Sequence, residues 1–183
     1  SFRLTYDPAG GCTSAASGDT DATARAMEAL LAVPRTPAVS DALVRAVVYA
    51  LGIQDPLTGA FGGTGPTAPA NANSTALFAQ VLRAAGHVEA ADAAARWIAQ
   101  LQLTAAGAGA AAADVGAIAY DGPALAAAVT GGVTSLARDQ WRRTTAQAVL
   151  GLGLPVLGSV DGPPALPVEV PTSPSTTAGP PSS

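Results

Sequence analysis

The stretch RAVVYALGIQDPLTGAFGG, residues 45–63, carries the most specific pattern in this chain. It begins as an apolar helical segment, breaks at a turn that contains Pro56, and leaves through glycines. Its defining positions are a basic and a small residue, an aromatic residue five places before a glutamine, and a Gly-Ala-aromatic exit: Arg45, Ala46, Tyr49, Gln54, Gly59, Ala60 and Phe61. The pattern marks either the remains of an active site or the junction between repeated helical hairpins.

The composition favours one helical domain. The chain has 183 residues, enough for a single core, and its many alanines suit closely packed helices. The net charge is −4 and every strongly basic side chain is an arginine. No basic stripe is present, so the sequence argues against nucleic-acid binding.

The chain divides into residues 1–158, which hold the helical repeats, and residues 159–183, which are rich in Pro, Ser and Thr. The second segment is typical of an extended tail on an exported surface protein, or of a plain linker. We therefore expect an extracellular or cell-wall-associated bacterial protein whose signal peptide lies outside this sequence. The uncharged runs are short for a membrane span of about 20 residues, so no transmembrane helix is expected.

Apolar periodicity and helix-capping residues predict a series of helices. We expect Asp19 or Asp21 to cap the first helix, and Pro34 and Pro37 to end it. Ser40 should cap the second helix. Asn73 or Ser74 should cap the third helix, and Gly86 should terminate it. The glycines of residues 104–118 argue against one long helix there. The predicted helices cover residues 19–33, 41–52, 74–85, 88–102 and 123–129, and a last one follows a cap at Thr134 or Ser135 and runs to about 152.

Three of these helices align without gaps and share a Thr-Ala pair, at residues 23–24, 75–76 and 145–146. Self-similarity over tens of residues indicates stacked supersecondary units. Each unit would be a helical hairpin that needs its neighbours to bury its apolar face.

The 45–61 pattern resembles the QW motif of the terpene cyclases, with Phe61 in place of the usual tryptophan. A weaker copy comprises Ala94, Trp97, Ile98 and Gln102, and its glycine-aromatic exit is missing or degraded. The resemblance covers about residues 19–153 and points to the squalene-cyclase and prenyltransferase repeat superfamily. In that family the glutamine ties the end of an outer helix to the next inner helix, and the aromatic residue stacks against it. The resemblance therefore implies structural roles for Tyr49, Gln54, Gly59, Phe61, Trp97 and Gln102.

The family fold is an α/α toroid of inner and outer helices, about six hairpins in all. Residues 21–33, 74–85 and 138–153 would be inner helices, and residues 41–52 and 88–102 outer ones. We thus expect an all-α arc of about three hairpins, a partial toroid. The remainder of the toroid, from the same precursor or another chain, is an expected partner, because an open arc exposes apolar helix faces.

Evidence for catalysis is weak. The stretch DTDATA, residues 19–24, resembles the DxDDTA motif of class II terpene cyclases, but Ala22 replaces one aspartate. Asp19 and Asp21 are weak catalytic candidates, and helix capping is the alternative role. Cys12 and His87 do not make the zinc site of protein prenyltransferases, so neither a metal nor a cofactor is expected.

A binding function is the more open hypothesis. If the inner helices run parallel, their N-termini gather at one mouth, where free amides and arginines could hold a polar or anionic small molecule. Capping groups on an exposed rim are the alternative. The candidate ligand-binding residues are Asn71, Asn73, Tyr120, Trp141, Arg142 and Arg143.

These observations lead to a non-enzymatic, exported, cell-surface domain that serves in ligand binding or structural display. One alternative is a terpene-cyclase or prenyltransferase-type enzyme half-domain. Another is a scaffold subunit whose open arc is covered by a partner chain.

Overall fold

The computed structural model describes residues 18–153, and the regular structure in this range is helical. Isolated β-bridges join Gly62 to Ala70 and Gln102 to Ile118. The predicted boundary between residues 158 and 159, and Cys12, lie outside the described residues. The elements are α1 (Thr20–Leu31), α2 (Pro37–Ile53), η1 (Gly65–Thr67), α3 (Ala72–Ala84), α4 (Val88–Gln100), η2 (Gly109–Asp114), α5 (Gly122–Gly131) and α6 (Arg138–Gly151).

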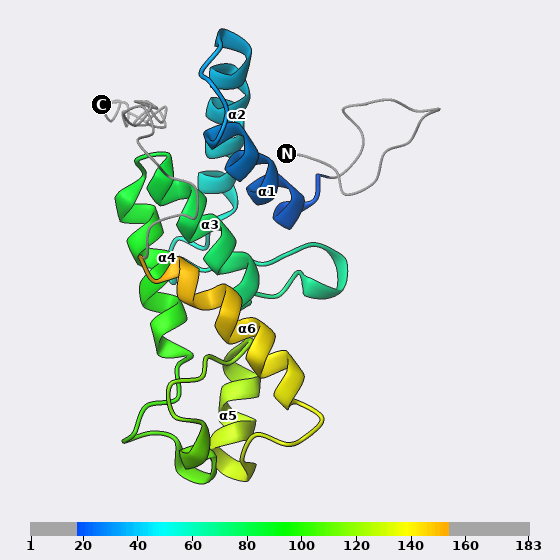
Figure 1. Cartoon of the computed structure of the whole chain (residues 1–183), viewed down its shortest axis with the longest axis vertical. Helices are drawn as coiled ribbons and strands as arrows, with labels where there is room; N and C mark the ends of the chain where they lie inside the picture. Colours follow the sequence, from blue (N-terminus) through cyan, green and yellow to red (C-terminus); the bar gives the residue numbers. More distant parts are fainter. Residues whose placement is uncertain (1–17, 154–183) are drawn as a thin grey trace, which may run out of the picture.

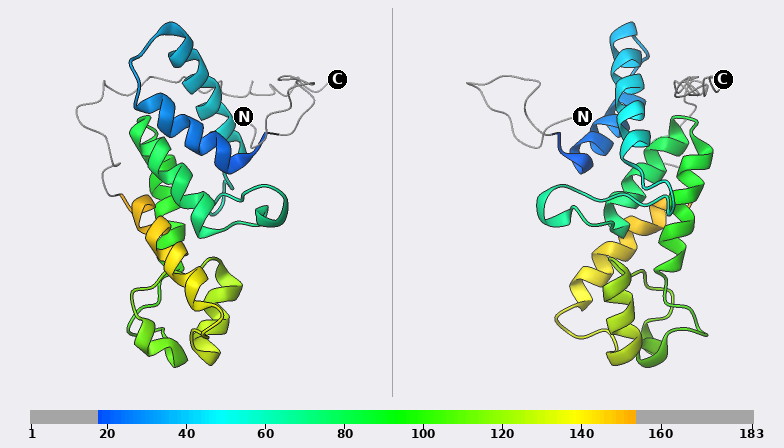
Figure 2. Two further views of the ribbon diagram at one scale, coloured as in Figure 1. Left: turned by 45° about the vertical axis from the view of Figure 1, so that its right-hand side comes forward. Right: turned by 180° about the vertical axis from the view of Figure 1, so that it is seen from behind.

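The helices form an arc (Figure 1). Helices α1, α3 and α6 run in the same direction, and α3 packs between the other two. Helix α2 packs against α1, and α4 packs against α3 and reaches α6 (Figure 2). This confirms the all-α partial toroid, with α1, α3 and α6 as the inner helices. The third pair is built differently, because α5 packs on η2.

Two predicted capping groups are confirmed. Asp19 caps α1, where its carboxylate accepts a hydrogen bond from the amide of Ala22 at 2.7 Å. Gly86 ends α3 with φ of +90°, and the amides of Gly86 and His87 donate to the carbonyls of Arg83 and Leu82. This pair of bonds is a Schellman motif, which satisfies carbonyls at the helix end and turns the chain into α4.

Other predicted boundaries are wrong. Helix α2 begins at Pro37, not at residue 41, and Thr36 caps it in place of Ser40. Proline suits the first turn of a helix because its missing N–H would have no partner there. Helix α3 begins at Ala72, and its cap is Asn71, whose side-chain oxygen accepts from the amide of Ser74 at 2.9 Å.

The later helices also differ in their ends. Helix α4 stops at Gln100, which leaves Gln102 in the bridge to Ile118. Helix α5 extends from Gly122 to Gly131 and is capped by Asp121. Helix α6 starts at Arg138, because Thr134 accepts from the amide of Ala137 and so caps a separate turn before the helix. Residues 104–118 are irregular apart from η2, as the glycines predicted.

The core consists of two clusters of small and medium-sized apolar side chains. The first joins α1, α2, α3 and α4, and in it Phe61 stacks on Phe78 with ring centroids 4.5 Å apart. The second joins α3, α4, α6 and the 101–119 segment around Ile98, Ile118 and Trp141. Gly151 and Ala76 lie at the contact between α6 and α3 and let these two helices approach closely.

Candidate functional site

Gln54 fastens the end of α2 to two other parts of the chain. Its side-chain amide donates to the carbonyls of Gly59 and Ala90, each at 2.9 Å. Two backbone bonds between Asp55 and the Gly59-Ala60 pair close the same loop. Ala90 belongs to α4. The glutamine therefore binds the next outer helix, whereas the family resemblance implied the next inner helix.

The second copy of this junction, whose exit the sequence suggested was missing or degraded, keeps a glycine contact but has Ile118 in place of the aromatic residue. Gln102 donates to the carbonyl of Gly116 at 3.0 Å, and Gly116 is followed by Ala117 and Ile118. Gly59 and Gly116 both have positive φ, +79° and +95°. The difference in residue number is 5 between Gln54 and Gly59 and 14 between Gln102 and Gly116. The longer insertion, which contains η2, hid the Gly-Ala-apolar exit from sequence analysis.

The threonine of the shared Thr-Ala pair makes the same hydrogen bond in two of the repeats. Thr75 accepts a hydrogen bond from the amide of Phe61, and Thr145 accepts one from the amide of Ile118, both at 3.0 Å. In each unit the inner-helix threonine thus binds the residue that follows Gly-Ala. A buried amide needs an acceptor, so this hydroxyl fixes the loop against the inner helix. Thr23, at the matching position of α1, donates to the carbonyl of Asp19 at 2.7 Å.

The two junctions differ in what covers their glycines, Gly59 and Gly116. A Cβ atom at Gly59 would lie 2.6 Å from Ala93 of α4, whereas a Cβ at Gly116 would meet nothing within 4 Å. At Gly116 the surface is instead hollowed into a groove of about 570 Å³. The groove therefore lies where the preceding repeat places an outer helix.

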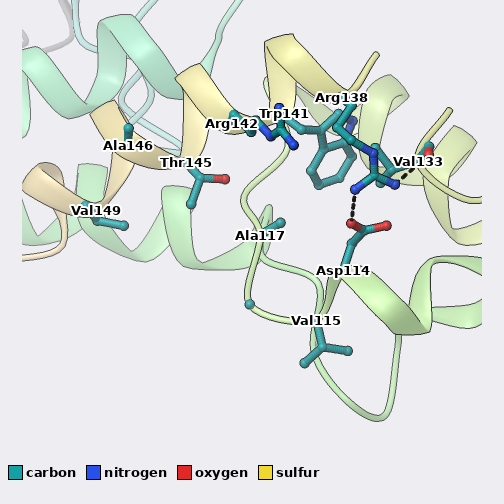
Figure 3. A pocket seen from close by; sticks show the side chains of 11 residues that line it. Asp114, Val115, Ala117, Val133, Arg138, Trp141, Arg142, Thr145, Ala146 and Val149 are labelled. Atoms are coloured by element: carbon teal, nitrogen blue, oxygen red, sulfur yellow. Dashed lines mark hydrogen bonds and ion pairs between the residues drawn. The ribbon is translucent and has the colours of Figure 1, made fainter. Parts of the chain in front are cut away.

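Helix α6 supplies one wall of this groove, which we call the α6 groove, and the 114–117 segment supplies the other (Figure 3). Trp141, Ala146 and Val149 line the helix side. Val115 and Ala117 line the opposite side, so most of the surface is apolar. An open apolar surface of this kind is a binding site in many proteins.

The charged end of the groove holds two arginines. Arg138 forms a salt bridge with Asp114 at 2.8 Å and also donates to the carbonyl of Val133 (Figure 3). Arg142 is exposed at the groove and forms no salt bridge within residues 18–153. Arg142 is thus the cation that could meet an anionic ligand. Arg143 instead pairs with Asp139 on the exposed side of α6 and does not line the groove.

The predicted mouth gathers only part of its expected residues. The amide of Ala72, at the start of α3, donates to the carbonyl of Tyr120. Burial raises the pKa of Tyr120, and the negative charges of Asp21 and Asp121 raise it further, so these groups lie within electrostatic range. Trp141 and Arg142 line the α6 groove rather than this mouth.

The polar side chains of the mouth are used mainly for structure. Asn71 caps α3 and also donates to the carbonyls of Thr67 and Pro69, so its hydrogen-bonding capacity is engaged. Asp19 is a cap. Asp21 and Asn73 each have one buried side-chain oxygen without a partner among the described residues. The mouth is therefore acidic and polar, so of the polar or anionic ligand that the sequence suggested, the anionic alternative is a poor match.

Tyr49 and Trp97, the remaining aromatic positions of the two junctions, are partly buried. Trp97 packs against the second core cluster and lines a recess of about 400 Å³ together with Gln54 and Gly59. These positions are compatible with the structural roles that the resemblance implied for them.

His87 lies in the turn between α3 and α4, and burial lowers its pKa. Within residues 18–153 no group of three or more His, Cys, Asp or Glu side chains could hold a metal ion. In the same range no helix is both long enough and apolar enough to cross a membrane.

No family model, curated protein or solved structure matches this chain. The fold and the site define the class of protein as an all-α helical-repeat arc with an open apolar groove at its last inner helix.

Proposed function

We propose that this chain is a non-enzymatic binding domain of an exported bacterial cell-surface protein, built on the terpene-cyclase and prenyltransferase repeat. Its binding site is the α6 groove. The observation that carries this proposal is the uncovered Gly116, since the equivalent Gly59 lies under α4. The Pro, Ser and Thr content of residues 159–183 supports the exported location.

The groove selects an elongated apolar ligand with one anionic group. Val115, which is 48% exposed, and Val149 offer apolar surface, whose burial stabilises a complex by about 25 cal/mol for each Å² removed from water. Arg142 offers a positive charge at one end. A volume of about 570 Å³ accommodates a small molecule or a short peptide segment.

The geometry of the aspartates favours binding over catalysis. Protonating an alkene requires a carboxylic acid that faces a closed, water-free cavity. Asp19 is occupied as the cap of α1, and neither Asp19 nor Asp21 lines the α6 groove.

The dye anilinonaphthalene sulfonate tests the proposal, because it joins an apolar aromatic body to an anion. In a Trp97→Phe variant of the full chain, Trp141 is the sole tryptophan and reports bound dye by energy transfer. We expect saturable binding that is lost in Ala146→Phe, which places a bulky ring in the groove. Ala99→Phe, at an exposed position of α4 outside the groove, is the matched control and should bind like the parent. Equal binding by both phenylalanine variants would refute the site.

A further inference from the structure

We infer that residues 154–161 of the same chain, LPVLGSVD, lie in the α6 groove and compete with its ligand. This inference rests on the proposed function, because it names an internal occupant of that site. Three features support it: the glycine that follows α6, the chemistry of the segment, and the open space at Gly116 on the groove wall.

The chain leaves α6 as it leaves α3. Gly86 follows the C-cap of α3 with φ of +90°, and the chain then returns along α3 as α4. Gly153 follows the C-cap of α6, Leu152, with φ of +102°. A glycine in this conformation just past a helix end reverses the direction of the chain. By analogy with α4, which returns along α3, the segment after Gly153 would return along α6 and meet the groove there.

The segment matches the groove in length and charge. Residues 154–160 are uncharged and mostly apolar, and Asp161 follows them. Seven extended residues span roughly 23 Å, and a helix of 14 residues such as α6 is about 21 Å long. Pro155 and Gly158 favour an extended course over a helix. Arg142 lies about 14 Å before the end of α6, so Asp161 would reach it without full extension of the segment, after the apolar side chains have passed Val149.

The groove wall offers space to such a segment. Gly116 has nothing within 4 Å of its Cβ position, so a backbone can approach it closely.

A spin label tests occupancy without any ligand. In the full chain with Cys12→Ser, a nitroxide on Ser159→Cys should broaden the NMR signals of Ala117 and of the Trp141 indole N–H. Adding Val156→Asp and Leu157→Asp should remove the broadening, because charged side chains oppose burial in an apolar groove. A label on Ser182→Cys is the distant control. Absence of broadening in the first protein, or broadening that the aspartates do not change, would overturn the inference.

Dye titration separates this inference from the proposed function. The Val156→Asp/Leu157→Asp chain should bind anilinonaphthalene sulfonate more tightly, on the order of tenfold, because the tethered competitor is removed. Val168→Asp/Val170→Asp, farther along the tail, should leave affinity unchanged. Equal affinity of all chains, with binding lost in Ala146→Phe, would overturn the inference and leave the proposed function intact. If no chain binds dye, the proposed function fails, and the spin label alone decides whether the segment occupies the groove.

Discussion

Two buried threonines of the inner helices differ in their hydrogen bonds. Thr75 and Thr144 are both completely buried. Thr75 accepts from the amide of Phe61 and donates to the carbonyl of Asn71 at 2.7 Å. The hydroxyl of Thr144 has no partner among the described residues. The alignment of Thr-Ala pairs predicted a repeated position, but not which backbone group the hydroxyl would bind, because that group comes from a distant loop.

At the residue scale, we predict opposite effects for the same substitution. Thr75→Val should lower the free energy of unfolding by about 1–3 kcal/mol, because it leaves the buried amide of Phe61 without an acceptor. Thr144→Val should be neutral or stabilising, since it replaces an unsatisfied buried hydroxyl with a methyl group of similar size. Urea unfolding of both variants measures the difference. Equal destabilisation would contradict the assignment of the hydrogen bonds.

Helix α6 reaches its place because glycine allows close approach to α3. A Cβ atom at Gly151 would lie 2.7 Å from the Cα of Ala76, on the backbone of α3. Gly131, the last residue of α5, would place a Cβ in open space. The two glycines look alike in sequence, since each is the last residue of a helix. Only the neighbouring helix distinguishes them.

At the element scale, Gly151→Ala should destabilise the protein by about 1–3 kcal/mol, because α6 must shift away from α3 to make room. Gly131→Ala should stabilise it by up to about 1 kcal/mol, since alanine restricts the unfolded chain and meets no obstacle. Thermal unfolding of the two proteins reports both effects. A stabilised Gly151→Ala protein would show that α6 does not pack on α3 as described.

The sequence located most helices but misplaced several of their ends. Pro37 and Asn71 are the clearest cases: the first was expected to end a helix and begins one, and the second was overlooked as a cap. Each residue is chemically suited to more than one position near a helix terminus. The tertiary contact decides, as when Asn71 also holds the loop carbonyls of Thr67 and Pro69.

The stability of the whole arc is coupled to its single imidazole. Burial lowers the pKa of His87 below its ordinary value of 6.5. The unfolded chain therefore takes up a proton near pH 6.5, while the folded chain does so only at lower pH. Protonation consequently favours the unfolded state as the pH falls through 6.5, and this effect levels off below the folded-state pKa.

At the scale of the molecule, we predict that the free energy of unfolding decreases between pH 7 and the folded-state pKa of His87. The His87→Gln variant should lack this part of the pH dependence. Because the chain has one histidine, NMR titration of its imidazole gives the folded-state pKa directly. A midpoint at or above 6.5 would contradict the burial of this side chain.

Part of the candidate site was within reach of sequence analysis. Trp141 and Arg142 were predicted ligand-binding residues and line the α6 groove, whereas Arg143 was predicted with them and points to Asp139 instead. Asp114, Val115 and Ala117 were not predicted. They belong to an irregular segment whose low-information composition gives no periodic signal, and they meet α6 only through the fold.

The sequence by itself determined where most helices lie, though not where they end. It also determined the first junction, because Gln54 and Gly59 are five residues apart and local geometry joins them. The tertiary structure decided the second junction and the groove. Gln102 meets Gly116 across an insertion, and Thr145 binds Ile118 at a separation of 27 residues. Contacts between distant residues depend on which surfaces bury one another, and no short pattern along the chain specifies that.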